Sequence, residues 1–368
     1  MEREIVYDVV VFDEGSEVGK LVGEGLRKEK GLNWTVTRVS SEEVGMSEEN
    51  SSSVLEIRSI EAEKISALVK KTKVAISLLE QNSGAESVLE TCAKNGVHCV
   101  TPSYKTPWLA DIIRKYHDIA QENRTMIIVG LGAETAPQDL LAYISATELR
   151  RKLQIDTREV VFSQPETKSS RYPRTEKRAT RLDPWSLSPV RGNFVSERTN
   201  AFGARKDLTL GHLSTSKNHY AQAIVHRSWG LLDPRTESVY GPNFCFNEFV
   251  ERNSSTATLK RKLFGTCCVP RESIICGNDR TGSGLSLGAV AIAHQEGPYP
   301  DRALSELKCA GTTENLTAVL LVQGAITILN GPKAKEIVGD GIVTPAMLGF
   351  PLISQLKEAG LEIESMLV

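Results

Sequence analysis

Residues 7–26 read YDVVVFDEGSEVGKLVGEGL, and this stretch decides the fold. An apolar run at 9–12 is followed by a polar turn and then by apolar residues at 18, 21, 22 and 26, which is helical spacing. The pattern predicts a buried parallel strand that enters a helix. In a doubly wound α/β domain, this first strand-turn-helix unit is where the diphosphate of a dinucleotide meets the helix N-terminus.

The turn itself is unfavourable for such a ligand. It carries the carboxylates of Asp13, Glu14 and Glu17, with glycine only at Gly15 and Gly19. Carboxylates suit the positive end of a helix, but they compete with a phosphate for its N–H groups and repel it. The stretch therefore favours the fold and argues against the cofactor.

Strand and helix patterns alternate up to about residue 132, which predicts a parallel sheet. Arg38 ends the second expected strand, where it is either a reader of an NADP 2′-phosphate or, more commonly, a solvated charge. Expected strands cover 34–38, 54–58, 74–79, 97–100 and 125–130, and expected helices cover 60–71, 87–95 and 106–123.

Beyond residue 132 the pattern changes to that of antiparallel strands in a second domain. We expect strands at 208–220, 223–232, 241–250 and 285–294, helices at 312–329 and 345–361, and a closing strand at 361–367 that returns to the first domain. Alternation in 223–229 would put Arg227 and Trp229 on one face and His226 on the other. The basic stretch 168–206 either binds an anionic ligand or the surface of a carrier protein, or is a solvated surface segment.

Composition points to a soluble, cytoplasmic protein without a bound metal. The 368 residues carry a net charge of −2, which gives no sign of nucleic acid or membrane attraction. No apolar run approaches the ~18 residues of a membrane span. The seven cysteines form no C-x-x-C pair, and His98 and His117 lack metal-ligand spacing.

Several segments, in the right order, resemble the saccharopine-dehydrogenase-like oxidoreductase family, whose members include trans-acting enoyl reductases. They are YDVVVF at 7–12 with GKLV at 19–22, KTKVAIS at 71–77, CAKNGVH at 92–98, PW at 107–108, GAETAPQD at 132–139, AIVHRSWGLL at 223–232 with YGPNF at 240–244, and GIVTPAMLG at 341–349. The resemblance implies a Rossmann-like domain (1–132), a second α+β domain with a mostly antiparallel sheet (133–335), and a C-terminal segment returning to the first domain (336–368).

The departures from the family pattern gather around its cofactor. The family's Gly-Ala-Thr-Gly-Phe-Thr-Gly loop is DEGSEVG at 13–19, and changes also occur at 38–40, 79–82, 101–106 and 131–135. Because these segments meet around one nucleotide in the family, we expect no cofactor here. Gly15, Gly19 and Arg38 would be the vestigial contacts if NADP is bound.

The leading hypothesis is therefore a cofactor-independent enzyme that cyclises or isomerises a small hydrophobic, polyketide- or terpenoid-like secondary metabolite, or takes it through a pericyclic reaction, in the cleft between the domains. The alternatives are an NAD(P)H-dependent reductase with an unusual loop and a non-catalytic, partner-binding homologue. A homodimer is left open. The expected catalytic residues are Lys105, Glu134, His226 and Arg227, and the expected substrate-binding residues are Tyr104, Trp108, Asp139 and Trp229.

Overall fold

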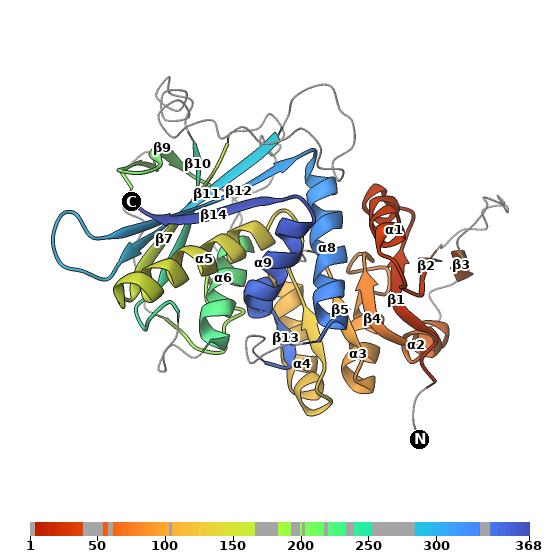
Figure 1. Ribbon diagram of the computed structural model, residues 1–368. Coiled ribbons are helices and arrows are strands. Elements are labelled where there is room, and N and C mark those ends of the chain that lie inside the picture. Colours follow the sequence, from red (N-terminus) through yellow and green to blue (C-terminus); the bar gives the residue numbers. More distant parts are fainter. Residues whose placement is uncertain are drawn as a thin grey trace. The chain divides into compact units, whose positions relative to one another are not determined.

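The structure is a computed structural model (Figure 1). It describes residues 4–39, 54–57, 62–102, 105–165, 183–192, 199–200, 203–216, 220–232, 239–251, 284–331 and 339–368. The chain divides into two compact units, Met1–Ala136 with Thr312–Ala359, and Pro137–Gly311 with Gly360–Val368. In these described ranges, no helix has both the length and the apolar character needed to cross a membrane.

The first unit is built on a parallel sheet. Its order is β13-β6-β5-β4-β1-β2-β3, so the direction of strand addition reverses between β1 and β4. The strands are β1 (Tyr7–Asp13), β2 (Trp34–Val39), β3 (Val54–Ile57), β4 (Thr72–Ser77), β5 (His98–Val100), β6 (Met126–Ile128) and β13 (Gly341–Val343). The register pairs Asp13 with Arg38 and Phe12 with Ser77, so the switch point lies beside the turn that follows β1.

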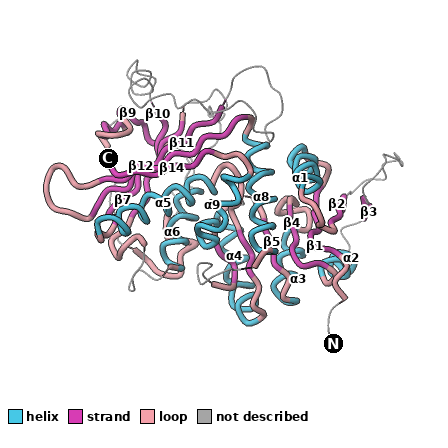
Figure 2. Tube along the Cα trace, viewed as in Figure 1, coloured by secondary structure: helices cyan, strands magenta, loops and turns pink. Residues whose placement is uncertain are grey.

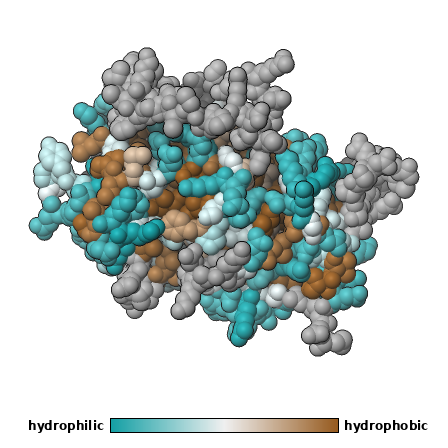
Figure 3. Space-filling model, viewed as in Figure 1, coloured by the Kyte–Doolittle hydropathy of each residue, from teal (hydrophilic) through white to brown (hydrophobic). Residues whose placement is uncertain are grey.

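Helices complete this unit: α1 (Glu17–Lys28), α2 (Ala62–Val69), α3 (Ala85–Asn95), α4 (Thr106–Glu122), α8 (Thr313–Leu329), the 3-10 helix η2 (Pro345–Leu348) and α9 (Gly349–Glu358). The predicted Rossmann-like domain is confirmed in its fold class. Figure 3 shows α1 as a hydrophilic element on the face turned to the viewer, while its Val22 and Leu26 are fully buried.

Helix α8 packs against α1 although nearly three hundred residues separate them in sequence. A Cβ built on Gly25 would lie 3.0 Å from Val322 Cγ2, and Gln323 Nε2 donates to Glu29 Oε1 at 3.3 Å. A capping box of Thr312 and Asn315 starts the helix. The expected boundary at residue 335 put this helix in the second domain, whereas it belongs to the first unit.

The second unit contains a seven-stranded sheet of order β14-β12-β11-β7-β10-β9-β8. Among the described strands of this sheet, only β7 and β10 pair in parallel, so the expected mostly antiparallel sheet is confirmed. The strands are β7 (Thr157–Gln164), β8 (Ala204–Asp207), β9 (Gly211–Thr215), β10 (Cys245–Glu251), β11 (Gly284–Ala293), β12 (Arg302–Ala310) and β14 (Glu362–Leu367). Among the described residues, the helices α5 (Ala136–Leu153) and α6 (Tyr220–Leu231) accompany the sheet (Figure 2).

Both helices are joined to strands of the sheet by hydrogen bonds. Ser305 Oγ donates to the Leu141 carbonyl of α5 at 2.9 Å, and Gln222 Nε2 of α6 donates to the Phe246 carbonyl at 2.7 Å. On the sheet, Val161, Leu213, Phe249, Val290 and Ile292 form a separate apolar cluster.

Two sequence-based expectations are wrong in this unit. Residues 223–231 form part of helix α6 rather than a strand, because the segment is apolar or small at nearly every position and is buried all round. The closing strand β14 pairs with β12, so it joins the second unit and does not return to the first domain. Part of the expected strand at 208–220 forms β9, which pairs with β8 as a short hairpin.

Candidate functional site

The turn between β1 and α1 is organised by the Asp13 carboxylate, which is buried. It accepts hydrogen bonds from Gly15 N at 2.9 Å, from Ser16 N at 3.0 Å and from Ser16 Oγ at 2.6 Å. Ser16 in turn caps the helix, because its Oγ accepts from Gly19 N at 2.9 Å. The amides of Gly15, Ser16 and Gly19 are therefore satisfied from within the chain.

The two glycines of the turn have different reasons to be glycine. Gly15 has φ +92°, a left-handed conformation that side chains other than glycine rarely adopt. Gly19 is helical, but a Cβ there would lie 2.8 Å from Asp13 Oδ1 and closer still to the rest of the carboxylate. Gly19 therefore makes room for Asp13.

Arg38 lies beside this turn. Its Nε would be 3.8 Å from a Cβ built on Gly15, and its side chain is exposed at the carboxyl end of β2. An exposed guanidinium at this position can bind a phosphate through a charge-assisted, bidentate contact.

Two more expected site residues are exposed after neighbouring strands of the same sheet. Lys105 stands directly before α4, after β5, and Glu134 lies in the turn that follows β6. The Glu134 turn is fixed on both sides, since Ala133 N donates to Thr317 Oγ1 at 3.1 Å and Thr135 Oγ1 donates to the Gly130 carbonyl at 2.6 Å.

Trp108 is half-buried in the first turns of α4. Tyr104 lies outside the described residues, as do most of the basic residues of 168–206. Among the described residues, no group of three or more His, Cys, Asp or Glu side chains is arranged to hold a metal.

His226 is a core residue of the second unit. It is 1% exposed, stacks on Trp185 at 3.9 Å between ring centroids, and accepts from Phe246 N at 3.1 Å through Nε2. Its Nδ1 lies 3.0 Å from the Pro184 carbonyl, so Nδ1 carries the proton and the ring is neutral. Burial lowers the pKa of His226 to about 4.

The other candidates of the second unit are buried as well. Arg227 Nη1 donates to the Leu187 carbonyl, and burial lowers the pKa of Arg227 to about 10, which leaves it charged at neutral pH. Trp229 Nε1 donates to the Gly241 carbonyl at 2.8 Å. Asp139 has no exposed surface and accepts from Ser228 Oγ. The structure therefore groups these side chains with His226 in a packed interior, apart in the chain from Lys105 and Glu134 of the first unit.

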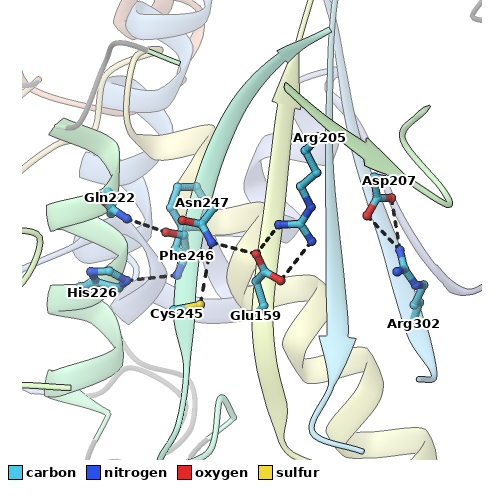
Figure 4. A network of polar contacts seen from close by, with 9 residues as sticks. All are labelled: Glu159, Arg205, Asp207, Gln222, His226, Cys245, Phe246, Asn247 and Arg302. Atoms are coloured by element: carbon cyan, nitrogen blue, oxygen red, sulfur yellow. Dashed lines mark hydrogen bonds and ion pairs between the residues drawn. The ribbon is translucent and has the colours of Figure 1, made fainter. Parts of the chain in front are cut away.

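Sequence reasoning missed a polar network on the second sheet (Figure 4). Arg205 makes a two-pronged ion pair with Glu159, whose Oε1 also accepts from Asn247 Nδ2 at 2.8 Å. Nearby, Arg302 Nη1 lies 3.1 Å from Asp207 Oδ2. Arg205 belongs to the basic stretch, so at least this charge is neutralised inside the unit. The sequence signal would have been a charged residue, Glu159, immediately before the apolar run Val160–Phe162 of an inner strand.

In Arg205 and Asp207, hydrogen bonds and ion pairs outweigh the effect of burial on the pKa. Desolvation alone would lower the pKa of Arg205, but its hydrogen bonds with Glu159 outweigh that effect and raise it. Desolvation alone would raise the pKa of Asp207, but the Leu210 amide and Arg302 outweigh it and lower the pKa. Arg205 and Asp207 thus remain charged at neutral pH, and the partner of each lies within the protein, which is typical of structural ion pairs.

The comparisons with known proteins bear on the first unit most directly. Residues 16–128 match the family described as the saccharopine dehydrogenase NADP binding domain. The match begins at Ser16, so it covers α1 to β6 and leaves out Asp13 and Gly15. No curated protein matches the chain.

Among solved structures, the chain is similar to apo histidine-tagged saccharopine dehydrogenase (L-Glu forming) from Saccharomyces cerevisiae, with TM-score 0.58, 11% identity, and coverage of 99% of this chain and 100% of that one. Dihydrodipicolinate reductase with bound dipicolinate from Paenisporosarcina sp. TG-14 matches with TM-score 0.42, 8% identity, and coverage of 93% and 99%. Amine dehydrogenase from Mycobacterium smegmatis matches with TM-score 0.44, 14% identity, and coverage of 94% and 96%. At these identities the likeness is one of fold, and only the first match is close enough to carry an argument.

A parallel sheet with a switch point between β1 and β4, followed by a mostly antiparallel second sheet, defines a two-unit protein with a Rossmann-like nucleotide-binding scaffold. Within that class, residues 16–128 match the saccharopine dehydrogenase NADP binding domain, and the chain is similar in fold to saccharopine dehydrogenase, as the sequence resemblance implied.

The family match overturns one prediction. The expected absence of any cofactor is wrong, because residues 16–128 match an NADP-binding domain and that match indicates NADP(H). The cofactor-independent cyclisation or isomerisation depended on that absence and loses its basis. The error came from treating the carboxylates of one turn as decisive for the whole domain.

The residues of the turn fit the cofactor in part. The switch point and the exposed Arg38 suit the adenosine end of NADP. The amides of Gly15 and Ser16 do not offer the usual diphosphate contact, because Asp13 already occupies them.

Proposed function

We propose that this protein is an NADP(H)-dependent oxidoreductase, the second of the functions expected from sequence. A bound nicotinamide would supply or accept a hydride. Support comes from the family of the matched domain, residues 16–128, and from the fold of the whole chain. The expected small hydrophobic ligand and homodimer remain predictions.

The observation that carries the proposal is the position of Arg38. It is the last residue but one of β2, in register with Asp13 of β1, and its Nε would lie 3.8 Å from a Cβ on Gly15. In a Rossmann-like domain this strand end meets the adenosine ribose, where an arginine favours a 2′-phosphate. We therefore assign the preference for NADP(H) over NAD(H) to Arg38.

Lys105 and Glu134 are proposed to face the substrate. Both are exposed and both follow strands at the carboxyl edge of the parallel sheet, the edge where ligands of open α/β sheets bind. A lysine there can polarise a carbonyl oxygen, and a glutamate can move a proton. Neither role extends to His226, whose two ring nitrogens bond to main-chain groups, or to Arg227, which is buried and donates from Nη1 to the Leu187 carbonyl.

The cofactor assignment is tested by calorimetric titration with NADPH and NADH. We expect NADPH to bind more tightly, and Arg38→Ala to remove most of that preference. One charge-assisted contact contributes about 1.5–3 kcal/mol, or roughly ten- to a hundredfold in affinity. Arg27→Ala is the matched control, because Arg27 is exposed on α1 and should leave both affinities unchanged. Failure of the wild type to bind either nucleotide would sink the proposal.

The substrate side is tested by a screen of carbonyl and enoyl compounds, read as loss of NADPH fluorescence. With a compound that turns over, Lys105→Ala and Glu134→Gln should each lower kcat/KM at least tenfold without changing NADPH affinity. Lys70→Ala, at an exposed position after α2, is the control. Unchanged turnover in both variants would remove Lys105 and Glu134 from the site.

A further inference from the structure

The Asp13 carboxylate occupies hydrogen-bond donors that a dinucleotide diphosphate would use. Gly15 N, Ser16 N and Ser16 Oγ all point at it, with donor–acceptor distances of 2.9, 3.0 and 2.6 Å. An anion bound at a helix N-terminus draws on such backbone N–H groups. Here the chain supplies that anion from its own β1.

The geometry around Asp13 shows that this side chain is built into the turn. Asp13 is 4% exposed, and the absence of a Cβ at Gly19 leaves the space that its carboxylate fills. Ser16 links the two, because its Oγ donates to Asp13 and accepts from Gly19 N. The carboxylate is thus held in place by three donors and by a helical glycine.

From this arrangement we infer that Asp13 is an affinity-determining residue, an internal anion that competes with the diphosphate of NADP(H) for the turn. The inference rests on the proposed function. It adds that the protein disfavours the diphosphate of NADP(H) but not its 2′-phosphate. Asp13 opposes the diphosphate, while Arg38 favours the 2′-phosphate. The observation is independent of the family match, which begins three residues after Asp13.

This competition explains how the fold can suit a dinucleotide while the turn between β1 and α1 disfavours its diphosphate. A diphosphate has to displace the carboxylate from the Gly15 and Ser16 amides or bind outside them, next to a like charge. Either route lowers affinity, since like charges a few ångströms apart repel and the amides cannot serve two acceptors fully. Removing the charge at residue 13 should therefore tighten binding.

The test titrates the full chain with two probes, NADPH and adenosine 2′-monophosphate, which lacks the diphosphate. Asp13→Asn keeps the size of the side chain and removes its charge, and Asp13→Gly opens the space. We expect both variants to bind NADPH about tenfold more tightly than the wild type, with unchanged affinity for adenosine 2′-monophosphate. Glu14→Gln is the matched control, because Glu14 is the exposed neighbouring carboxylate and should change NADPH affinity much less.

Each outcome decides the matter. Equal NADPH affinity in the wild type and in both Asp13 variants overturns the inference, and if that affinity is measurable the proposed function still stands. NADPH binding by an Asp13 variant alone supports the inference and counts against the proposed function of the wild type. Absence of NADPH binding in all of them overturns both. Thermal unfolding without nucleotide checks that each variant is folded, and if Asp13→Asn is not folded the decision falls to Asp13→Gly.

Discussion

The Asp13 carboxylate lies against Gly19 so closely that a Cβ at position 19 would stand 2.8 Å from Asp13 Oδ1. Gly19→Ala should therefore destabilise the first unit by about 1–3 kcal/mol, the usual cost of overpacking, although alanine is the better helix former. Chemical denaturation measures the change.

Removing the carboxylate should reverse that cost. In the double variant Asp13→Gly with Gly19→Ala, the added methyl group enters the space that Asp13 leaves, so position 19 should become neutral or stabilising relative to Asp13→Gly alone. A cost for Gly19→Ala that is the same in both backgrounds would show that the two residues are not coupled.

The buried His226 predicts a loss of stability in acid. Its pKa is about 4 in the folded protein against an ordinary value of 6.5, so the unfolded chain takes up the proton first. The stabilisation is complete above pH 6.5 and is lost as the pH falls towards 4, by an amount on the order of 3 kcal/mol.

Denaturation curves at several pH values measure this effect. His226→Asn can still accept from Phe246 N and does not titrate, so it should lower stability at pH 7 and flatten the pH dependence between 6.5 and 4. A slope that the substitution leaves unchanged would assign the effect to other groups.

Removing one partner of the Arg205–Glu159 ion pair should destabilise the fold more than replacing both partners. Both side chains are under 10% exposed, so Glu159→Gln leaves a buried, partly uncompensated guanidinium and should cost about 3–5 kcal/mol. Glu90→Gln is the matched control, because the Lys94–Glu90 pair is exposed and contributes about 0.5 kcal/mol or less.

Replacing both partners with apolar residues of similar size should restore much of the stability. Arg205→Met with Glu159→Leu removes the uncompensated charge. If the double variant is as unstable as Glu159→Gln, the Asn247 bond to Glu159, rather than the ion pair, would be the main contribution.

His117 should stabilise strand β13, which lies at the edge of the parallel sheet. Its Nδ1 accepts from Ile342 N at 3.0 Å, and a Cβ on Gly341 would lie 2.6 Å from its Cε1. His117→Ala should speed hydrogen exchange at the Ile342 amide by one to two orders of magnitude, through local opening. Exchange at Ile127 of the neighbouring β6 serves as the internal control, and equal changes at both amides would indicate global destabilisation instead.

The sequence specifies some parts of this molecule strongly. The Val9–Phe12 run and the spacing of Val18, Val22 and Leu26 allow only a strand followed by a helix, and the structure agrees. Helix α6 was mistaken for a strand because Ala223 to Trp229 are buried at every position, so an alternating pattern fits as well as a helical one.

The candidate site was harder to predict for physical reasons. Arg227 and Trp229 are residue types that bind ligands, but only tertiary packing reveals that Arg227 Nη1 and Trp229 Nε1 donate to carbonyl groups of the chain. The charge of Asp13 was evident from sequence, whereas its bonds to Gly15 and Ser16 depend on turn geometry. The cofactor prediction failed because one turn was weighed above the domain around it.

The path of the chain through its two compact units has a consequence for biogenesis. The chain leaves the first unit at Ala136, re-enters it at Thr312 and ends in the second with β14. Neither unit is formed by one continuous segment of the chain. During translation the first unit therefore cannot be completed before α8 is synthesised, and the second sheet cannot be completed before β14 is synthesised. A fragment ending near residue 311 would release two incomplete cores at once, which makes late translational arrest more damaging here than in a protein with sequential domains.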